Sequence, residues 1–226
     1  MIINFLIIIQ GTMENIVLVG SGGCMREILW QIYEGKNAKE WKVLGYVDNK
    51  KAEGNEDCYV SGICCPYLGD DMWLLEQKSE INVAITVGNP GLRRKIVQKL
   101  KKNEFIKFPT LILGSAQVCK DIEMGQGCII STECCISTNV KIGNFVFVNI
   151  GGMICHDGII GDFVTISPRA ALAGAVRVGE NSDIGMGTHV IQGIEIGKNV
   201  VVGAGSAVIR NIADDCKVVG VPTRNL

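Results

Sequence analysis

An aliphatic or methionine side chain recurs at every sixth position from residue 124 to residue 208. An unbroken six-residue period is typical of a parallel β-helix, in which each short unit buries its apolar side chain only by stacking on its neighbours. We therefore predict a β-helix of hexapeptide repeats for this part of the chain. The fifteen positions are Met124, Ile130, Ile136, Ile142, Val148, Ile154, Ile160, Ile166, Leu172, Val178, Ile184, Val190, Ile196, Val202 and Val208.

A second series supports strands within this repeat. Side chains alternate across a strand, so the residue two places before each aliphatic one should also face the interior. These positions are nearly all small or β-branched, and they include Cys128 and Cys134. Glycine follows the aliphatic residue in seven hexads, where we expect a tight corner or a close backbone approach. The seven are Gly125, Gly143, Gly161, Gly179, Gly185, Gly197 and Gly203.

The chain before the repeat has a different pattern, which predicts a small Rossmann-like domain. A buried strand is expected over 15–19, followed by a glycine-rich turn and an amphipathic helix that includes Ile28, Leu29, Ile32 and Tyr33. Further strands are expected over 43–47 and 82–87, and a helix from about 91 to 102. Strands that alternate with helices in this way are typical of a parallel sheet.

Polar residues and glycines follow three of these strands, at the edge where such folds bind ligands. A glycine-rich turn at a helix N-terminus lets backbone amides approach a phosphate. A lone turn of this kind more often only tightens the connection, but the residues after the other two strands favour a ligand crevice. Met25 stands where the dinucleotide fingerprint needs its third glycine, which disfavours a full NAD site. The candidate substrate-binding residues are Gly20, Ser21, Gly22, Gly23, Asp48, Asn49, Gly88 and Asn89.

Composition divides the chain at the same place. All three Trp and all four Tyr lie before residue 74, and only 7 of the 22 Lys and Arg residues follow residue 120. We expect domains at 13–110 and 111–226, and an apolar extension over 1–12, with Met13 as an alternative start. That extension is too short for a membrane span of about 20 residues and lacks the features of a signal peptide.

Charge and cysteine usage exclude several functional classes. A net charge of -1 gives no electrostatic footprint for nucleic acid. The ten cysteines form no CxxC pair, so we interpret them as reduced residues of a cytoplasmic protein. Only two histidines are present, His156 and His189, and we predict no metal site. A γ-class carbonic anhydrase, which shares the β-helix, would need three histidine ligands on zinc.

A base and a carboxylate, His156 and Asp157, interrupt the aliphatic repeat at a predicted corner. Gly174 follows His156 by one coil of 18 residues, so it should lie above the imidazole, leaving room for a substrate and exposing its N–H. Asn149 should lie on the preceding face of the same coil. Histidine is suited to accept a proton near neutral pH, and an N–H can hold an oxyanion. From these residues alone, an acyl-transfer site and a solvated surface pair are equally well supported.

His189 and Cys155 are weaker candidates. His189 directly precedes an inward valine, so we interpret it as a structural residue on an outer face. Cys155 neighbours His156, but adjacent residues of a strand point to opposite sides, so a thiol nucleophile and an acyl-enzyme are disfavoured.

Nearly the whole chain, from Asn15 to Arg224, resembles the sialic-acid O-acyltransferase family of bacterial sugar acetyltransferases, which includes N-acetyltransferases acting on UDP-4-amino-sugars. The matching stretches are GSGGCMREI (20–28), GYVDNK (45–50), VGN (87–89), 149–157, IGDFVTISP (160–168) and GVPTR (220–224). The resemblance implies a left-handed, triangular β-helix with three hexads per coil, hence about five coils. It also implies acetyl-CoA as co-substrate, bound between adjacent subunits of a homotrimer.

The resemblance also implies roles for individual residues. His156 matches the general base, Asp157 the acid that orients it and Asn149 a polar active-site residue, while the amide of Gly174 matches one that approaches the acetyl thioester. Three positions depart from the family. Cys24 stands where a histidine is usual, Thr165 replaces a second histidine that helps some members bind acetyl-CoA, and Asp157 is often glutamate.

We therefore predict an acetyltransferase that moves an acetyl group from acetyl-CoA to the amino group of a nucleotide-linked amino-sugar. The alternative within the same class is O-acetylation of a sialic acid or a related free sugar. The glycine-rich turn with Asp48 favours a nucleotide-linked substrate, since a free sugar would not need it. A non-catalytic trimeric scaffold or nucleotide-sugar sensor is the alternative from another class.

Overall fold

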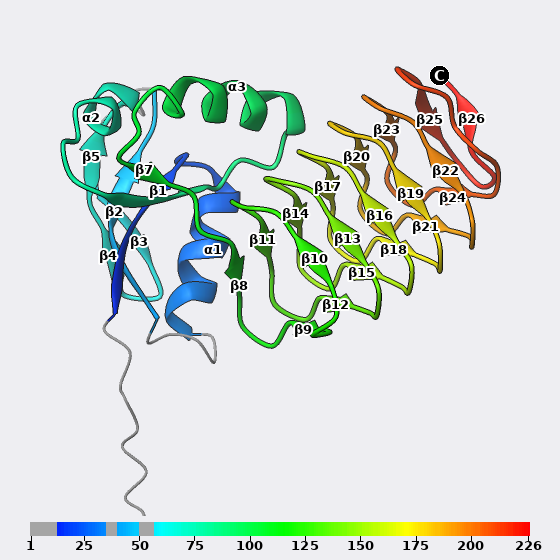
Figure 1. The fold of residues 1–226 in the computed structure, drawn as a ribbon, viewed down its shortest axis with the longest axis horizontal. Helices are drawn as coiled ribbons and strands as arrows, with labels where there is room; N and C mark the ends of the chain where they lie inside the picture. Colours follow the sequence, from blue (N-terminus) through cyan, green and yellow to red (C-terminus); the bar gives the residue numbers. More distant parts are fainter. Residues whose placement is uncertain (1–12, 35–39, 50–56) are drawn as a thin grey trace, which may run out of the picture.

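The chain folds into a small α/β domain followed by a left-handed parallel β-helix (Figure 1). The computed structural model describes residues 13–34, 40–49 and 57–226. The apolar extension expected over 1–12 lies outside the described residues. Both predicted architectures are confirmed.

The N-terminal domain is built on a five-stranded parallel sheet in the order β5-β2-β1-β6-β7. The predicted strand–turn–helix unit is present, and the strand expected over 82–87 ends two residues early. Just after this strand, Thr86 N and Oγ1 both donate to Val19 O, at 3.0 and 2.7 Å, and so attach Thr86 to the end of the neighbouring strand. The strands are β1 (Glu14–Val19), β2 (Trp41–Val47), β5 (Tyr67–Gly69), β6 (Ile81–Ile85) and β7 (Ile106–Lys107).

Helices cover both faces of this sheet and dock it onto the β-helix (Figure 1). The helix α1 (Gly23–Glu34) packs with Ile129 and Phe147 of the β-helix in one apolar cluster. The helix α3 (Pro90–Leu100) lies on the other face, in a cluster with Phe145 and Phe163. A short helix α2 (Asp71–Leu75) and a hairpin of β3 (Cys58–Val60) and β4 (Ile63–Cys65) complete the domain.

The β-helix has three sheets of very short strands, which the chain visits in turn. The six-stranded sheet contains β9 (Gln117–Val118), β12 (Cys135–Ile136), β15 (Met153–Ile154), β18 (Ala171–Leu172), β21 (His189–Val190) and β24 (Ala207–Val208). The five-stranded β-helix sheet contains β10 (Glu123–Met124), β13 (Lys141–Ile142), β16 (Ile159–Ile160), β19 (Arg177–Val178) and β22 (Glu195–Ile196).

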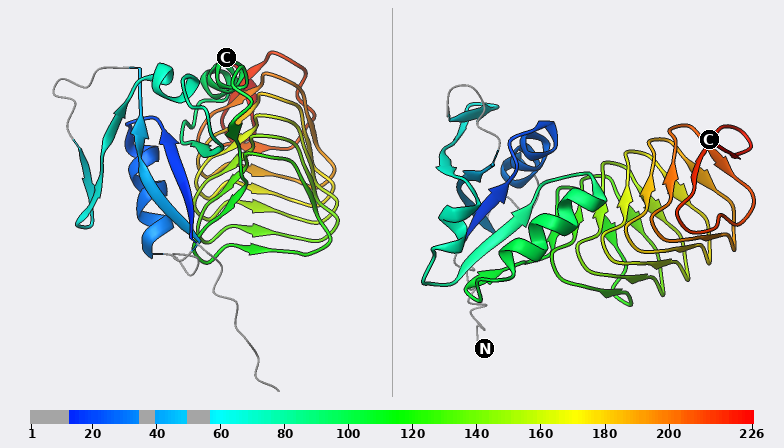
Figure 2. Two further views of the ribbon diagram at one scale, coloured as in Figure 1. Left: turned by 60° about the vertical axis from the view of Figure 1, so that its left-hand side comes forward. Right: turned by 90° about the horizontal axis from the view of Figure 1, so that it is seen from above.

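The eight-stranded sheet faces the N-terminal domain. It contains β8 (Leu111–Ile112), β11 (Ile129–Ile130), β14 (Phe147–Val148), β17 (Thr165–Ile166), β20 (Asp183–Ile184), β23 (Val201–Val202), β25 (Lys217–Val219) and the antiparallel β26 (Arg224–Asn225). Five coils would give five strands in each sheet, but two of the three sheets have more. The additional strands β8, β9 and β25 lie outside the hexad series from which the coils were counted. Figure 2 shows the C-terminus at the end of the β-helix that is remote from the N-terminal domain.

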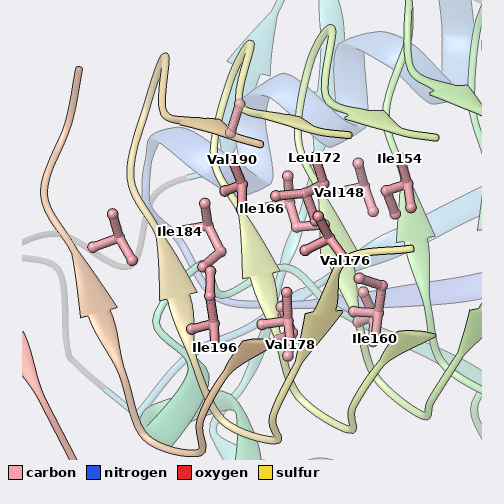
Figure 3. Packing of buried hydrophobic residues seen from close by; sticks show 14 of the residues in the cluster. Val148, Ile154, Ile160, Ile166, Leu172, Val176, Val178, Ile184, Val190 and Ile196 are labelled. Carbon is pink, nitrogen blue, oxygen red and sulfur yellow. The ribbon is translucent and has the colours of Figure 1, made fainter. Parts of the chain in front are cut away.

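The hexad series forms the interior of the β-helix (Figure 3). Fourteen of the fifteen positions are buried, and Met124, at the start, packs partly buried against them. Cys128 and Cys134 are buried in the second series, as predicted. The aliphatic side chains form a continuous core, since each one contacts the equivalent side chains one coil above and one coil below.

Two kinds of corner residue keep the coils in register. The glycines after the aliphatic position are required by close backbone approach, since a Cβ at Gly161 would lie 2.7 Å from Glu180 N. A different position, three residues after each aliphatic one, often adopts the left-handed conformation, including Asn139 (φ +54°) and Asp157 (φ +60°). Asparagine and aspartate tolerate this conformation better than most residues.

Candidate functional site

The carboxyl ends of β1, β2 and β6 open into a crevice of about 460 Å³. Seven of the eight substrate-binding candidates line it. The exception is Asn89, whose Oδ1 accepts the N–H of Leu92 at 2.9 Å and so caps the N-terminus of α3. The lining candidates are Gly20, Ser21, Gly22, Gly23, Asp48, Asn49 and Gly88.

Two carboxylates are fixed in this crevice. Asp48 accepts a 2.6 Å hydrogen bond from Ser21 Oγ, which ties the glycine-rich turn to the end of β2. Asp71 is buried, accepts from Asn49 Nδ2, and pairs with Lys99 at 2.9 Å. Sequence reasoning missed Asp71, since it follows a three-residue strand that gives almost no pattern. The crevice therefore presents backbone amides beside fixed hydrogen-bond acceptors, a combination suited to a nucleotide.

Cys24 also lines the crevice, at the start of α1. Burial raises the pKa of its thiol to about 12, and the Glu27 carboxylate acts in the same direction. The group is therefore a protonated thiol at neutral pH, which makes it a weak donor and a poor nucleophile.

A buried arginine that sequence reasoning did not identify joins the crevice to the β-helix. Arg93 is 1% exposed, and its guanidinium donates to Val87 O and Gly88 O at 2.8 and 2.9 Å. The same group donates to four acceptors of the β-helix, at 2.9 to 3.1 Å: Phe145 O, Phe163 O, Val164 O and Thr165 Oγ1. Burial lowers the pKa of Arg93 to about 10, so the side chain remains a cation at neutral pH.

Thr165 belongs to this junction between the domains. Its side chain is buried, and its hydroxyl donates to Gly88 O at 2.6 Å while accepting from Arg93. The structure does not bring it together with His156. A contact between Thr165 and acetyl-CoA stays a prediction, and the hydroxyl is already engaged by these two partners.

The second group of candidates lies at the corner that follows β15. His156 is half-exposed, and its Nδ1 lies 2.8 Å from Asp157 Oδ2. Hydrogen bonds from His156, which has the larger effect, and from Asn139 hold the pKa of Asp157 below its ordinary value. An ionised carboxylate only accepts, so in the neutral imidazole Nδ1 carries the proton and Nε2 keeps its lone pair. The imidazole is thus oriented to accept a proton at Nε2.

Gly174 lies directly over this imidazole, as the 18-residue spacing predicts. The strands β15 and β18 pair in that register, and a Cβ on Gly174 would lie 2.4 Å from His156 Nε2 and Cε1. Within the part of the chain that the structure describes, the Gly174 N–H donates to no other group. The imidazole and a backbone N–H without a partner among the described residues therefore lie side by side at this corner.

Asn149 follows β14, on the preceding corner of the same coil, where it was expected. Its Oδ1 accepts the N–H of Ile150 at 2.7 Å. His189 is exposed on the outer face of β21, the location that its place before an inward valine predicts. The described residues contain no group of three or more His, Cys, Asp and Glu placed to hold a metal ion.

The crevice and His156 lie on different sides of the β-helix. The N-terminal domain covers the eight-stranded sheet, through the clusters of α1 and α3 and the Arg93 contacts. His156 instead follows a strand of the six-stranded sheet. One copy of the chain therefore does not bring the two groups of candidates together.

Comparison with known proteins identifies similar sequences among sugar N-acetyltransferases. Residues 15–100 match the family model of the PglD N-terminal domain. The chain is 32% identical over 161 residues to a GDP-perosamine N-acetyltransferase of Escherichia coli, an alignment that spans 66% of this chain and 64% of that enzyme. This chain thus aligns with somewhat less than two thirds of that relative.

Two solved structures share the whole architecture. PerB from Caulobacter crescentus, in complex with CoA and GDP-perosamine, is 29% identical, with a TM-score of 0.83 over 94% of this chain and 97% of that one. The acetyltransferase domain of PglB from Neisseria gonorrhoeae, in complex with acetyl coenzyme A, is 26% identical, with a TM-score of 0.84 over 95% and 100%. The present chain combines the same two domains in the same order. No helix among the described residues is long and apolar enough to cross a membrane.

Proposed function

We propose that this chain transfers the acetyl group of acetyl-CoA to the amino group of a nucleotide-linked amino-sugar. The observation that carries the proposal is the corner at which His156, oriented by Asp157, lies against Gly174, whose N–H has no partner among the described residues. The relatives support it, since PerB is in complex with CoA and GDP-perosamine. GDP-perosamine is therefore the first acceptor to test.

In the proposed reaction, His156 Nε2 removes a proton from the amine as its nitrogen attacks the thioester carbonyl. The carbonyl oxygen becomes an oxyanion, to which the Gly174 N–H donates. The C–S bond then breaks, and the CoA thiolate takes the proton from the imidazolium. General-base catalysis contributes about 10²–10⁴-fold, and an oxyanion donor about 10²–10³-fold.

The crevice would hold the nucleotide. Amides of the Gly20–Gly23 turn, at the N-terminus of α1, suit the diphosphate, and Asp48 at the end of β2 suits a ribose hydroxyl. Asp71, beside Asn49, provides a further acceptor in the same cavity. The Arg93 contacts would keep the Gly88 side of the crevice in a fixed position on the β-helix.

We propose a homotrimer in which the crevice of one subunit faces His156 of another. This arrangement would unite two groups that one chain holds apart. Apolar side chains along the six-stranded sheet support it, since Met153, Ile191 and Ile209 are 43%, 50% and 42% exposed. An apolar row of this kind is an expected contact surface for a second copy. All ten cysteines are free, which fits the reducing cytoplasm, where we place the enzyme.

A thiol-release assay tests the proposal. Protein and acetyl-CoA are mixed with GDP-, UDP- and dTDP-linked amino-sugars, or with free sialic acid, and CoA thiol is followed with a disulfide reagent. Turnover is expected with a nucleotide-linked amino-sugar. Turnover with sialic acid alone would indicate the O-acetyltransferase instead, and nucleotide-sugar binding without any thiol release would indicate a sensor.

A further inference from the structure

Asn139 lies one coil before Asp157 and contacts the side of its carboxylate that His156 leaves open. Its Nδ2 donates to Asp157 Oδ1 at 2.6 Å, while Asp157 Oδ2 lies 2.8 Å from His156 Nδ1. Each carboxylate oxygen thus has its own partner. A carboxylate held at both oxygens cannot rotate without losing one of these hydrogen bonds.

Backbone conformation and hydrogen bonds to the preceding coils hold Asn139 and Asp157 in these positions. Asn139 and Asp157 both adopt the left-handed conformation, so the two side chains leave successive coils in the same direction. Asp157 N donates to Thr138 O at 3.2 Å. One further coil down, Asp121 accepts from Asn139 N at 3.3 Å and from Thr138 Oγ1. The ladder from Asp121 through Asn139 to Asp157 therefore ends on the imidazole of His156.

The direction of these hydrogen bonds has a chemical consequence. The Asn139 amide nitrogen can only donate, so it favours the ionised form of Asp157. An ionised Asp157 in turn holds the proton of neutral His156 on Nδ1. If the carboxylate turned away, the imidazole would be free to carry that proton on Nε2, the atom that faces Gly174.

We propose that Asn139 is a positioning residue, which locks the carboxylate of Asp157 so that His156 keeps Nε2 unprotonated. This inference rests on the proposed function only for its effect on turnover. Its effect on the imidazole follows from the contacts themselves. Neither the hexad pattern nor the family resemblance singled out Asn139.

The chain contains a matched control for this ladder. Asn199, also left-handed (φ +53°), donates through Nδ2 to Asp215 Oδ1 at 2.9 Å, and Asp215 is left-handed too (φ +59°). Asp215 has no neighbouring histidine in the sequence. Asn199→Ala therefore removes the same kind of corner hydrogen bond without touching the candidate site.

The test reads the histidine directly. Only two histidines are present, so long-range ¹H–¹⁵N spectra of ¹⁵N-histidine-labelled protein at mildly alkaline pH report the tautomer of His156, with His189 as internal reference. We expect the Nδ1–H form in the wild type, a shift towards Nε2–H in Asn139→Ala, and no change in Asn199→Ala. A His156 tautomer that Asn139→Ala leaves unchanged, while Asp157→Asn alters it, would overturn the inference.

Turnover supplies the second readout. Loss of one charge-assisted hydrogen bond should lower kcat roughly tenfold in Asn139→Ala, with the KM values for both substrates unchanged. In an Asp157→Asn background, the same substitution should have no further effect, because it acts through that carboxylate. An equal loss in both backgrounds would contradict a positioning role. A wild type that shows the expected tautomer but no turnover would reject the proposed function and leave the assignment of Asn139 intact.

Discussion

Gly174→Ala is the substitution for which the structure makes the sharpest prediction. The new Cβ would lie 2.4 Å from Nε2 and Cε1 of His156 and 3.0 Å from Nδ1. Non-bonded heavy atoms prefer separations of about 3.5–4.0 Å, so the imidazole must move by at least about 1 Å. The obstructing group is the end of a half-exposed side chain, which can rotate towards solvent.

The fold should therefore tolerate this substitution while the chemistry does not. Gly174 is itself buried, but the group that must give way is half-exposed, so the loss of stability should be at most about 1 kcal/mol and Tm should stay within about 4 °C. A misplacement of about 1 Å at a reacting group can cost about 10²-fold. We expect kcat for acetyl transfer to fall by about two orders of magnitude, measured by CoA release at saturating acceptor.

A second background separates the displaced ring from other causes. In His156→Ala the clash is absent, so adding Gly174→Ala should cost little more. A Gly174→Ala enzyme with kcat within about threefold of the wild type would refute the reasoning, since an effect of about 10²-fold is expected for the displaced ring. A further large loss in the double variant would also contradict it, because the new methyl group would then obstruct something other than the ring.

Three further predictions concern the base, the domain junction and the cysteines. His156→Ala should lower kcat by roughly 10²-fold or more with an unchanged circular dichroism spectrum, and unchanged turnover would remove it as the base. Arg93→Met leaves buried carbonyls without a donor, at about 1–3 kcal/mol each, so urea unfolding should show a loss of several kcal/mol. The control Arg94→Met loses a partly exposed pair with Glu180 and a cation–π contact with Phe163, so it should cost at most about 1–2 kcal/mol. Equal losses in the two variants would contradict the assignment. Alkylation at mildly alkaline pH, followed by peptide mass mapping, should label exposed Cys64 and Cys119 well before Cys24, whose raised pKa keeps the thiol protonated. Rapid loss of the Cys24 thiol would contradict the raised pKa.

The sequence predicted the β-helix well because its period is rigid. Each hexad repeats one structural unit, so counting in sixes placed Cys128 and Cys134 inside, and counting in eighteens placed Gly174 over His156. The first two strands of the N-terminal sheet were predicted to within two residues at each end, because each is a compact apolar run. The local sequence pattern was sufficient to predict the structure wherever the same environment recurs along the chain and requires the same kind of residue.

Contacts between distant segments could not be predicted in the same way. In the sequence, nothing distinguishes Arg93 from the other cations of its predicted helix. It becomes buried among carbonyl groups only when that helix docks onto the β-helix. Thr165 was interpreted from resemblance, which gave no sign that its hydroxyl donates to Gly88 O across the junction between the domains. Asn139 was missed because the left-handed corner position is occupied by many residue types, including Phe145 and Arg169, and so gives no sequence pattern.

Product analysis tests the central claim most directly. Wild-type protein, acetyl-CoA and GDP-perosamine are incubated, and the nucleotide-sugar is then examined by mass spectrometry before and after treatment with hydroxylamine, which cleaves acetyl esters but not amides. The account predicts one added acetyl group per CoA released, resistant to hydroxylamine, and absent or strongly reduced with His156→Ala. An acetyl group removed by hydroxylamine, or a nucleotide-sugar that binds and is never acetylated, would contradict it.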